Sequence, residues 1–578
     1  MKLSYVSTVN VTRLPASPVP GTLLDRVETL TDAIATLATG FPDHPCLVVL
    51  DRDRRERFLT LGTLWRAAGQ VGAALVARGL RPGRFVLLAL PTGPELLAAY
   101  FGVMRAGGIP GLIAPPSNRF ADRHVYAAYL SALARQAEAH SLYCDAAVAE
   151  AFQADVSALP DVTMLTPADV ARSEAAPPPL TAAPDDVATV QYSSGSTGIQ
   201  KGVLLSHRAI LANIAATRDA FDLTSTDVSV NWIPLYHDMG LIDAFLMPVL
   251  GGTPAVLIPT MDFMREPALW LWALHRYRGA FSIAPNFAYA LCARRIPDAE
   301  LVSLDLYCWR VAANGSEPAL ASTIEDFTRR FSAYGFRREA MTPTWGLAEN
   351  VCIATVHAPD EPPLIETVDR DALATENVAR PRRGGGLASV SVGRAIPGCT
   401  LQIRDADRRP LPDRHVGEIW VRSTSLFLGY HHDAELTARI LVDGWLDTGD
   451  RGYLADGHLH FVSREKDLIV IGGEKYAPHD LETIINRVPG VREGCTAVFG
   501  VLNEVRGTED IAAVVETRET DVATLTRLED TIRAEITRAT GLGLRHVILV
   551  PPGGVEKTTS GKLARSATQR RYADRLMD

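Results

Sequence analysis

The sequence predicts an α/β fold with a large, multi-layer N-terminal domain, whose sheets are covered by helices, and a small α+β C-terminal domain. Short apolar runs alternate with helical patterns through the first third of the chain, and the pattern changes near residue 465. Such alternation places helices over the faces of a mostly parallel sheet. A chain of 578 residues, 47% of them apolar, is long enough for several layers.

The first third supplies three clear elements. Residues 60–78 carry apolar side chains at helical spacing and end at Gly79, which favours a helix end there. Residues 84–90 form a continuous apolar run, which is typical of a buried strand. Residues 94–105 return to a helical pattern. These segments predict a helix, a strand and a second helix in succession.

The middle of the chain predicts a connector and a buried helix–turn–strand unit. Residues 171–186 are rich in alanine and proline and indicate a surface connector, after which residues 187–192 predict a strand. The apolar stretch 241–260 contains an aspartate, two adjacent glycines and three prolines, so it is a poor membrane-spanning helix. We expect it to form core: a helix, a glycine turn and a strand at 255–258.

The last part of the chain contains an irregular region and a change of pattern. Residues 357–386 enclose a short helical pattern at 368–373 that Asp369 could cap. An irregular segment of this length within a compact domain is more often functional or mobile than without a role. Residues 447–461 alternate as a hairpin does. We place a domain boundary at about residue 465, which gives domains 1–464 and 465–578, with a strand at 468–471 and a helix from about His479.

Charge and cysteine usage exclude several classes of protein. The chain has 58 Lys and Arg against 67 Asp and Glu, a net charge of −9, so we expect no nucleic-acid partner. The seven cysteines are scattered and form no Cys-x-x-Cys pair, which argues against disulfides and structural zinc. Together with an N-terminus that lacks a secretory pattern, this favours a cytoplasmic protein with no membrane span.

The strongest local signal is the segment 192–202, which follows a predicted strand. It holds three glycines in eight residues, which let the backbone approach an anion closely, together with several hydroxyl groups and Lys201. This combination suits a triphosphate, although the spacing is not that of a Walker loop. A flexible Ser/Gly linker is the alternative, and the flanking buried strand argues against it.

Five further motifs follow in order. They are Asn314-Gly315-Ser316-Glu317-Pro318, Thr344-Trp345-Gly346-Leu347-Ala348-Glu349-Asn350, Trp445-Leu446-Asp447-Thr448-Gly449-Asp450, Ser463-Arg464-Glu465-Lys466-Asp467 and Lys557-Thr558-Thr559-Ser560-Gly561-Lys562. With the segment 192–202, they resemble the signature motifs of the adenylate-forming enzymes, which include acyl-CoA synthetases, luciferases and peptide-synthetase adenylation domains. The resemblance covers nearly the whole chain.

The resemblance implies an ATP site, with Mg²⁺ as a cofactor, and a role for each matching residue. The implied nucleotide-binding residues are Ser193, Ser194, Gly195, Ser196, Thr197, Gly198, Lys201, Asn314, Gly315, Ser316, Glu317, Pro318, Thr344, Trp345, Gly346, Asp450, Arg464 and Lys466, of which the last two also flank the interdomain hinge. Thr197 and Glu349 would hold Mg²⁺, for which a carboxylate is a suitable hard ligand. Lys562 would be the catalytic lysine, because a mobile cation can stabilise the charge that develops during adenylation. Taken alone, Glu349, Asp450 and Lys562 would be a surface acid, a turn residue and a solvated cation.

Three further stretches resemble one subfamily, the fatty acyl-AMP ligases. Residues 231–242 and 284–289 resemble its acyl-pocket motifs, and residues 357–386 resemble the insertion that separates these ligases from acyl-CoA ligases. The implied reaction activates a fatty or related carboxylic acid to acyl-AMP and releases pyrophosphate. The acyl group then passes to the phosphopantetheine thiol of an acyl carrier protein, while the insertion restrains the C-terminal domain and disfavours transfer to coenzyme A.

Two alternatives remain open at this point. The protein could be an acyl-CoA ligase, or an adenylating enzyme that uses another nucleophile. It could also be a non-catalytic adenylate-binding relative, which the intact motifs argue against.

Departures from the subfamily pattern concern the acyl pocket. Residues 243–245, Ser282-Ile283 and Val392 are bulkier than the pattern and favour a shorter or polar-modified acyl substrate. Asp243 could contact an amino group on the substrate, but a capped or water-exposed aspartate is the favoured interpretation. His237, the remaining candidate catalytic residue, is expected to gate or pack against the acyl-adenylate, because an ionised carboxylate needs no base.

Overall fold

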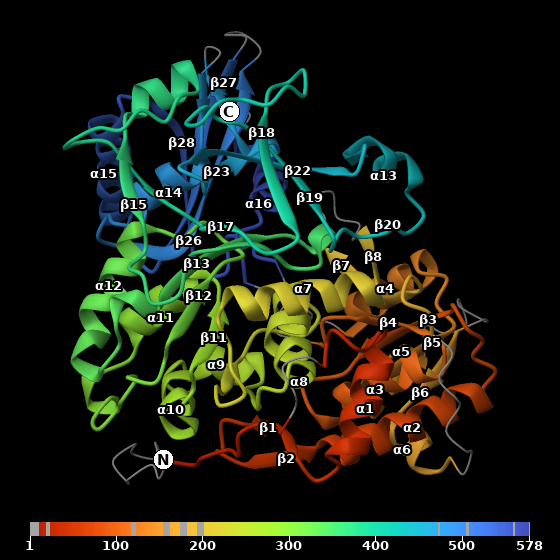
Figure 1. Ribbon diagram of the computed structural model, residues 1–578. Coiled ribbons are helices and arrows are strands. Elements are labelled where there is room, and N and C mark those ends of the chain that lie inside the picture. Colours follow the sequence, from red (N-terminus) through yellow and green to blue (C-terminus); the bar gives the residue numbers. More distant parts are fainter. Residues whose placement is uncertain are drawn as a thin grey trace.

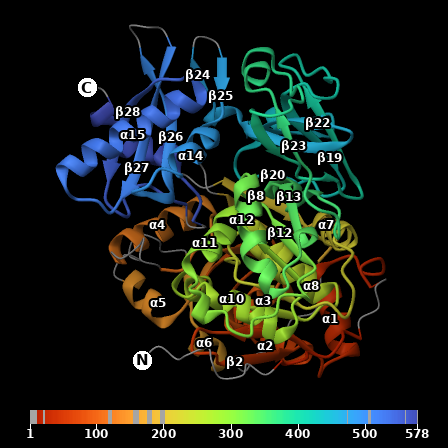
Figure 2. The same cartoon turned by 90° about the vertical axis from the view of Figure 1, so that its left-hand side faces the viewer.

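The computed structural model describes residues 11–18, 23–116, 123–153, 162–173, 182–193, 201–471, 474–503, 508–558 and 561–576. It has a large N-terminal part built on two sheets, with a smaller C-terminal part packed against one side (Figures 1 and 2). The predicted α/β class is confirmed. In the described ranges, no helix is long and apolar enough to cross a membrane.

The larger sheet has nine strands and is parallel at its centre. Its order is β17 (Arg394–Ala395), β14 (Ile353–Val356), β13 (Met341–Gly346), β12 (Val311–Asn314), β11 (Phe281–Ala284), β9 (Ser229–Asn231), β10 (Ala255–Leu257), β1 (Pro45–Leu50) and β2 (Glu56–Thr60). The pairs from β13 to β1 are parallel, and both edges end in antiparallel pairs. The carboxyl ends of the parallel strands β12 and β13 therefore lie side by side.

The second sheet has seven strands. Its order is β20 (Gly429–Tyr430), β8 (Lys201–Ser206), β7 (Val187–Ser193), β4 (Ile109–Leu112), β3 (Phe85–Ala89), β5 (Ser141–Cys144) and β6 (Thr163–Leu165). Helix α7 (His207–Ala220) contacts both sheets, through β8 and β14, and crosses the centre of the molecule in Figure 1. One apolar cluster spans the two sheets and the helices between them, and a second, smaller cluster packs on the other face of the seven-stranded sheet.

Helices cover both sheets. They are α1 (Leu30–Gly40), α2 (Leu61–Ala77), α3 (Pro94–Arg105), α4 (Arg123–Gln136), α5 (Ala146–Gln153), α6 (Pro167–Ala171), α8 (Met247–Leu250), α9 (Thr260–Arg265), α10 (Ala268–Tyr277), α11 (Asn286–Arg295) and α12 (Ala321–Phe331). The predictions for 60–78, 84–90 and 94–105 are confirmed by α2, β3 and α3. A capping box fixes the start of α2, in which Thr60 and Thr63 accept each other's backbone N–H groups.

The stretch 241–260 folds as buried core, as predicted. Met239–Leu246 is a π-helix, α8 follows it, and β10 comes after the Gly251-Gly252 turn. All eight residues of the π-helix are buried. The strand prediction for 187–192 is also confirmed, by β7, whereas residues 174–181 of the expected connector lie outside the described residues.

A smaller antiparallel sheet leads toward the C-terminal part. It is built from β18 (Cys399–Arg404), β19 (Gly417–Ser423), β21 (Leu441–Val442), β22 (Trp445–Ala455) and β23 (His458–Arg464), with α13 (Ala434–Ile440) beside it. The predicted hairpin is β22–β23, and its turn residues Asp456 and Gly457 both have positive φ. The irregular region contributes the hairpin β15 (Ile365–Val368) and β16 (Leu387–Val390).

The helical prediction at 368–373 needs a correction. Val368 ends β15, and the helix is a short π-helix, Ala372–Glu376. Asp369 does act near its start, because its carboxylate accepts the N–H groups of Asp371 and Ala372. The cap was therefore correct, but the strand extends into the segment that the pattern assigned to a helix.

The C-terminal part has apolar clusters of its own. Its elements are β24 (Ile469–Ile471), β25 (Glu474–Tyr476), α14 (Pro478–Ile485), β26 (Val491–Asn503), β27 (Thr508–Thr517), α15 (Val522–Thr540), β28 (Leu544–Val550) and α16 (Arg565–Arg571). The expected strand and helix after residue 465 are β24 and α14. The predicted boundary falls on the single turn Glu465–Asp467, and it stays a prediction.

Candidate active site

The predicted motifs converge where the C-terminal part meets the carboxyl ends of β12 and β13. At the centre, the buried Asp450 carboxylate accepts a hydrogen bond from Trp345 Nε1 at 2.9 Å, and Arg464 Nε lies 3.2 Å from its other oxygen. Burial raises the pKa of Asp450, while Arg464 and Trp345 oppose that shift. Three motifs that lie far apart in sequence thus meet at one carboxylate.

The loop between β7 and β8 begins at a strand pair. Ser193 pairs with Lys201 in the antiparallel ladder, so the two ends of the loop are held together. Ser194, Gly195, Ser196, Thr197 and Gly198 lie outside the described residues, as does the side chain of Ser193. Lys201 Nζ lies 5.2 Å from the centre of the Tyr430 ring, which is cation–π range.

Glu349, on the 3-10 turn Ala348–Asn350, contacts the same tyrosine. Its Oε1 accepts a short hydrogen bond from the Tyr430 hydroxyl. Burial raises the pKa of Tyr430, and the neighbouring Glu349 charge raises it further, so the phenol stays a donor. Tyr430 therefore links Lys201 to Glu349, a role that local sequence reasoning missed because it depends on the pairing of β20 with β8.

The segment from Asn314 to Pro318 leaves the end of β12. Asn314 Nδ2 contacts Asn286 Oδ1 at 3.3 Å, whereas its buried Oδ1 has no hydrogen-bond partner among the described residues. Gly315 passes so close to β13 that a Cβ there would lie 2.4 Å from Thr344 Oγ1. Glu317 accepts the Phe287 N–H at 3.0 Å and so caps the N-terminus of α11.

Lys562 reaches this site from the C-terminal part. Its Nζ lies 3.1 Å from His237 Nε2. A tight turn presents it, because the Thr558 N–H bonds the Lys562 carbonyl and the Thr558 hydroxyl accepts the Lys562 N–H. Gly561 has φ +89°, and a Cβ there would lie 3.5 Å from the Phe287 ring, so this turn packs against the start of α11.

Charged groups surround the Lys562 ammonium. Burial lowers the pKa of Lys562 and Arg464 lowers it further, while Asp238 and Glu317 oppose the shift. Asp238 Oδ1 lies 2.5 Å from His237 Nδ1. Burial disfavours the Asp238 carboxylate, but His237, Lys562 and the Met239 N–H outweigh it and lower the pKa of Asp238 to about 2. Asp238 thus orients His237 toward the lysine.

Ion pairs hold the turn Glu465–Asp467 between the two parts. Glu465 lies 3.1 Å from Arg451 Nη1 and 2.9 Å from Lys475 Nζ, and Asp467 lies 3.1 Å from Arg565 Nη1. Arg565 begins the helix that follows the Lys562 turn, so this ion pair connects that turn to the hinge segment. Lys466 is exposed, with Lys201 and Asp450 among the charges that act on it.

The irregular region 357–386 contacts the C-terminal part. The short helix Ala372–Glu376 packs beside β25, and a cavity lies between the two parts. Its lining includes Arg370, Leu373 and Asn377 from the irregular region, and Tyr476, Asp480 and Leu542 from the C-terminal part. These contacts place the region where it can restrain the C-terminal part.

The structure corrects the favoured interpretation of Asp243. It has no exposed surface, so it is not water-exposed, and it lies within the π-helix rather than at its end. Its Oδ2 accepts a hydrogen bond from the Cys352 thiol at 2.9 Å. Burial raises the pKa of Asp243 to about 8.

Cys352 is presented by strained backbone. Val351, a β-branched residue, has φ +63° and ψ −62°, and the Cys352 N–H bonds the Asn350 carbonyl two residues back. This γ-turn is a strained conformation, and such strain clusters at functional sites. It directly follows Glu349 in the chain.

Comparisons with known proteins agree with this geometry. The AMP-binding enzyme family matches residues 34–431. The chain is 31% identical to the medium-chain-fatty-acid–[acyl-carrier-protein] ligase JamA of Moorena producens, over 85% of this chain and 86% of that protein. It is 32% identical to the long-chain-fatty-acid–AMP ligase FadD26 of Mycobacterium marinum, over 90% and 93% respectively.

A solved structure from a study of fatty acyl-adenylate ligases from E. coli and L. pneumophila superposes with a TM-score of 0.90. The two chains are 31% identical, and the match covers 95% of this chain and 99% of the other. The similarity therefore extends through both the large and the small part of the fold.

Proposed function

This chain belongs to the AMP-binding enzyme family, and on that premise we propose that it is a fatty acyl-AMP ligase that loads an acyl carrier protein. It uses ATP to activate a fatty or related carboxylic acid. The acyl-adenylate then passes its acyl group to the pantetheine thiol of the carrier. The cytoplasm, where ATP is abundant, is the compartment that we propose for it.

The observation that carries the proposal is the contact between Lys562 and His237, together with the ion pair of Arg464 with Asp450, since the Arg464 charge also acts on Lys562. In adenylation, a carboxylate oxygen of the acid forms a bond to the α-phosphorus of ATP, and the bond from that phosphorus to pyrophosphate breaks. Both reactants are anions, so a cation held between them stabilises the charge as they approach. Lys562 is positioned for this role, and His237 and Asp238 orient its ammonium group.

Other side chains fit the nucleotide. The unpartnered Asn314 Oδ1 is a buried acceptor that suits an exocyclic amino group of adenine. The missing side chain at Gly315 keeps the backbone close to Thr344, which leaves a flat surface for the base. Asp450 is held by Trp345 and Arg464 with lone pairs left for the ribose hydroxyls.

Glu349 fits a magnesium site in which substrate phosphates supply the other ligands. No group of three or more His, Cys, Asp or Glu side chains that could hold a metal occurs within the described ranges. Mg²⁺ is commonly held by one or two carboxylates together with substrate phosphates, so a single carboxylate suffices. When bound, the ion neutralises phosphate charge. We propose Glu349 and Thr197 as its protein ligands, with Tyr430 orienting the Glu349 carboxylate.

The second half-reaction needs a different placement of the C-terminal part. The carrier thiol loses its proton, its sulfur forms a bond to the acyl carbon, and AMP leaves with the oxygen that joined it to the acyl group. Because Lys562 and its turn occupy one side of the site, we propose that residues 465–578 rotate about the turn Glu465–Asp467 to admit the thiol. Contacts of the irregular region with the C-terminal part limit that rotation and favour a carrier over free coenzyme A.

The test separates the two half-reactions. We expect carboxylate-dependent ATP–pyrophosphate exchange with wild-type protein, and thioester formation with a phosphopantetheinylated carrier but not with coenzyme A. Lys562→Ala should lower the exchange rate by at least 100-fold, because the stabilising cation is gone. It should leave ATP binding and the melting temperature nearly unchanged.

Exchange by Lys562→Ala at the wild-type rate would refute the role of the lysine. Efficient transfer to coenzyme A would instead favour an acyl-CoA ligase. The matched control is Lys557→Ala, which removes a lysine from the same segment and should retain exchange.

A further inference from the structure

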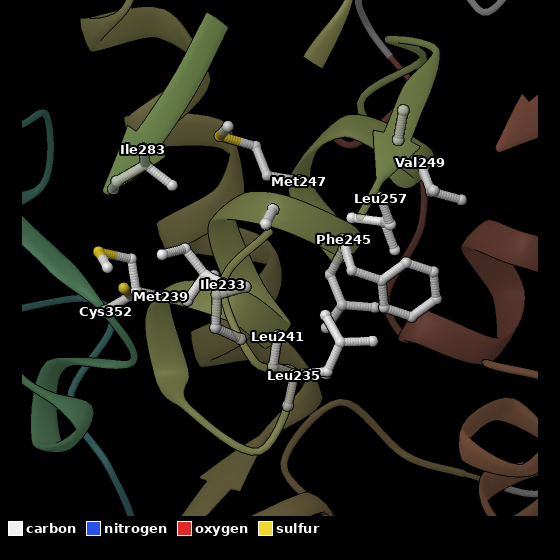
Figure 3. Packing of buried hydrophobic residues seen from close by; sticks show 14 of the residues in the cluster. Ile233, Leu235, Met239, Leu241, Phe245, Met247, Val249, Leu257, Ile283 and Cys352 are labelled. Carbon is white, nitrogen blue, oxygen red and sulfur yellow. The ribbon is translucent and has the colours of Figure 1, made fainter. Parts of the chain in front are cut away.

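An unsatisfied carboxyl group lies inside an otherwise apolar element of the acyl region. Asp243 is the only charged residue of the π-helix Met239–Leu246, and the whole helix is buried. Met239, Leu241 and Phe245 from this helix pack among other apolar side chains in Figure 3, and Cys352 belongs to the same apolar cluster. A carboxyl group in such surroundings costs stability unless its polar atoms are paired.

One oxygen of this carboxyl group lacks a partner. The Cys352 thiol donates to Oδ2, but a thiol is a weak donor. Oδ1 is buried and has no hydrogen-bond partner in the part of the chain that the structure describes. The remaining hydrogen-bonding capacity is therefore available to a group that is not part of this protein.

The position of Asp243 relates it to the reacting end of the substrate. Asp238, which contacts His237, lies at the start of the same helix, five residues before Asp243. Cys352, the hydrogen-bond partner of Asp243, comes three residues after Glu349 in the chain. Asp243 thus lies near the groups that would hold the substrate carboxylate. A substituent that reaches Asp243 therefore lies on a carbon near the carboxylate, not at the far end of the acyl chain.

The chemistry of Asp243 and Cys352 favours a neutral group as the partner of the free Asp243 oxygen. A hydroxyl group can donate to the free oxygen or accept from the protonated acid, so it satisfies Asp243 in either protonation state. An ammonium group would have to leave water and enter an apolar wall, which burial disfavours. A methylene group would leave the oxygen unpaired.

We propose that Asp243 is a specificity-determining residue that hydrogen-bonds a hydroxyl group near the carboxylate end of the substrate's acyl chain. The preferred substrate is then a hydroxy acid with its hydroxyl on a carbon close to the carboxylate. This inference rests on the proposed function, since it defines the class of acid that the same site activates.

The test compares acids of equal chain length in pyrophosphate exchange with wild-type protein. The panel is an unsubstituted fatty acid, its β-hydroxy, γ-hydroxy and ω-hydroxy derivatives, and its β-amino derivative. We expect kcat/KM to be at least about 10-fold higher for the better of the β- and γ-hydroxy acids than for the unsubstituted and ω-hydroxy acids. Equal values, or a preference for the ω-hydroxy or β-amino acid, would overturn the inference and leave the proposed function intact. Exchange with none of the acids would contradict both.

Two variants of similar size then assign the preference to Asp243. Asp243→Asn keeps a hydrogen-bonding group and should retain a preference for the hydroxy acid. Asp243→Leu offers none and should reverse it, raising kcat/KM for the unsubstituted acid and lowering it for the hydroxy acid. An unchanged preference in Asp243→Leu would overturn the assignment. The wild-type panel needs no variant, so it decides the substrate class even if Asp243→Leu does not fold.

Discussion

At the scale of single residues, Asp450 shows how a side chain can join distant motifs. Its carboxylate is held by Trp345 from β13 and by Arg464 at the end of β23. A buried carboxylate with two such partners is already oriented before a ligand binds, so little reorganisation is needed on binding. We therefore expect Trp345 to act on the nucleotide through Asp450.

Replacing this tryptophan tests that link. Trp345→Phe removes the Nε1 donor but keeps an aromatic ring, and a hydrogen bond to a charged group contributes about 1.5–3 kcal/mol. We expect the KM for ATP to rise about 10-fold or more, with kcat changed less. Steady-state exchange kinetics measure both constants.

A control for that change is available in the core. The Trp272 indole donates to the Glu300 carbonyl at 2.9 Å, and neither residue belongs to a nucleotide motif. Trp272→Phe should lower the melting temperature and leave the KM for ATP unchanged. If the two variants had the same KM, Trp345 would be a packing residue only.

Asp243 also makes the stability of the folded protein depend on pH. Its folded pKa is about 8, above the ordinary 3.8, because burial disfavours the carboxylate and ionised Asp238 adds to the shift, while the facing Cys352 thiol opposes it. Between these two values, the unfolded chain has released the proton that the folded protein keeps. The free energy of unfolding therefore falls as pH rises through this window, by up to about 1.4 kcal/mol per unit.

Asp243→Asn should remove this contribution. We expect its free energy of unfolding, measured by urea titration at several pH values across the window, to fall less steeply with rising pH than that of the wild type. Parallel curves for the two proteins would show that Asp243 ionises normally in the folded state.

At the scale of elements, β12 and β13 approach closely at the end where we propose that the nucleotide binds. A Cβ at position 315 would lie 2.4 Å from Thr344 Oγ1, which no ordinary contact allows. Gly315→Ala should therefore push the two strand ends apart. We expect ATP affinity, measured by calorimetry, to fall at least about 10-fold, since residues that we propose to bind ATP sit on these ends.

A second substitution can relieve that clash. Thr344→Ala removes the Oγ1 atom that the new methyl group would meet. We expect the double variant Gly315→Ala/Thr344→Ala to bind ATP better than Gly315→Ala alone, which is a coupling that a double-mutant cycle measures. Additive losses would mean that Gly315 serves another purpose.

The sequence predicts elements well where the local pattern decides them. The segments that form α2, β3 and α3 show clear periodicity, and the Asp-Gly pair identifies the β22–β23 turn. The π-helix at 239–246 and the γ-turn at Val351 could not be predicted in this way. Both conformations are stabilised by tertiary packing against local preference, and such departures are expected where function requires them.

The same distinction between local sequence pattern and tertiary contacts applies to the candidate active site. The motifs themselves were readable, but Tyr430 and Asp238 were missed, because their roles depend on contacts between distant segments. Asp243 was misjudged as a capped or water-exposed residue, since a charged residue is rarely buried. Its apolar neighbours on both sides were the available signal for burial.

At the scale of the whole molecule, the turn Glu465–Asp467 connects the two parts of the fold, and we propose that these parts change their relative placement between the half-reactions. Arg464 before it is extended, with φ −84° and ψ 138°, and Glu465 starts the 3-10 turn. Proline is tolerated at the first position of such a turn and keeps the preceding residue extended. Glu465→Pro therefore fits the conformation seen here and restricts departure from it.

Glu465→Pro should separate the two half-reactions. The variant keeps Lys562 in the site, so pyrophosphate exchange should stay within about 3-fold of the control Glu465→Ala, which loses the same ion pairs to Arg451 and Lys475. Acyl transfer to the carrier, followed in single-turnover experiments, should be at least 10-fold slower than in that control, because the backbone cannot turn. If both variants transferred equally fast, the rotation would have to occur elsewhere in the chain, and residue 465 would not mark the boundary between the moving parts.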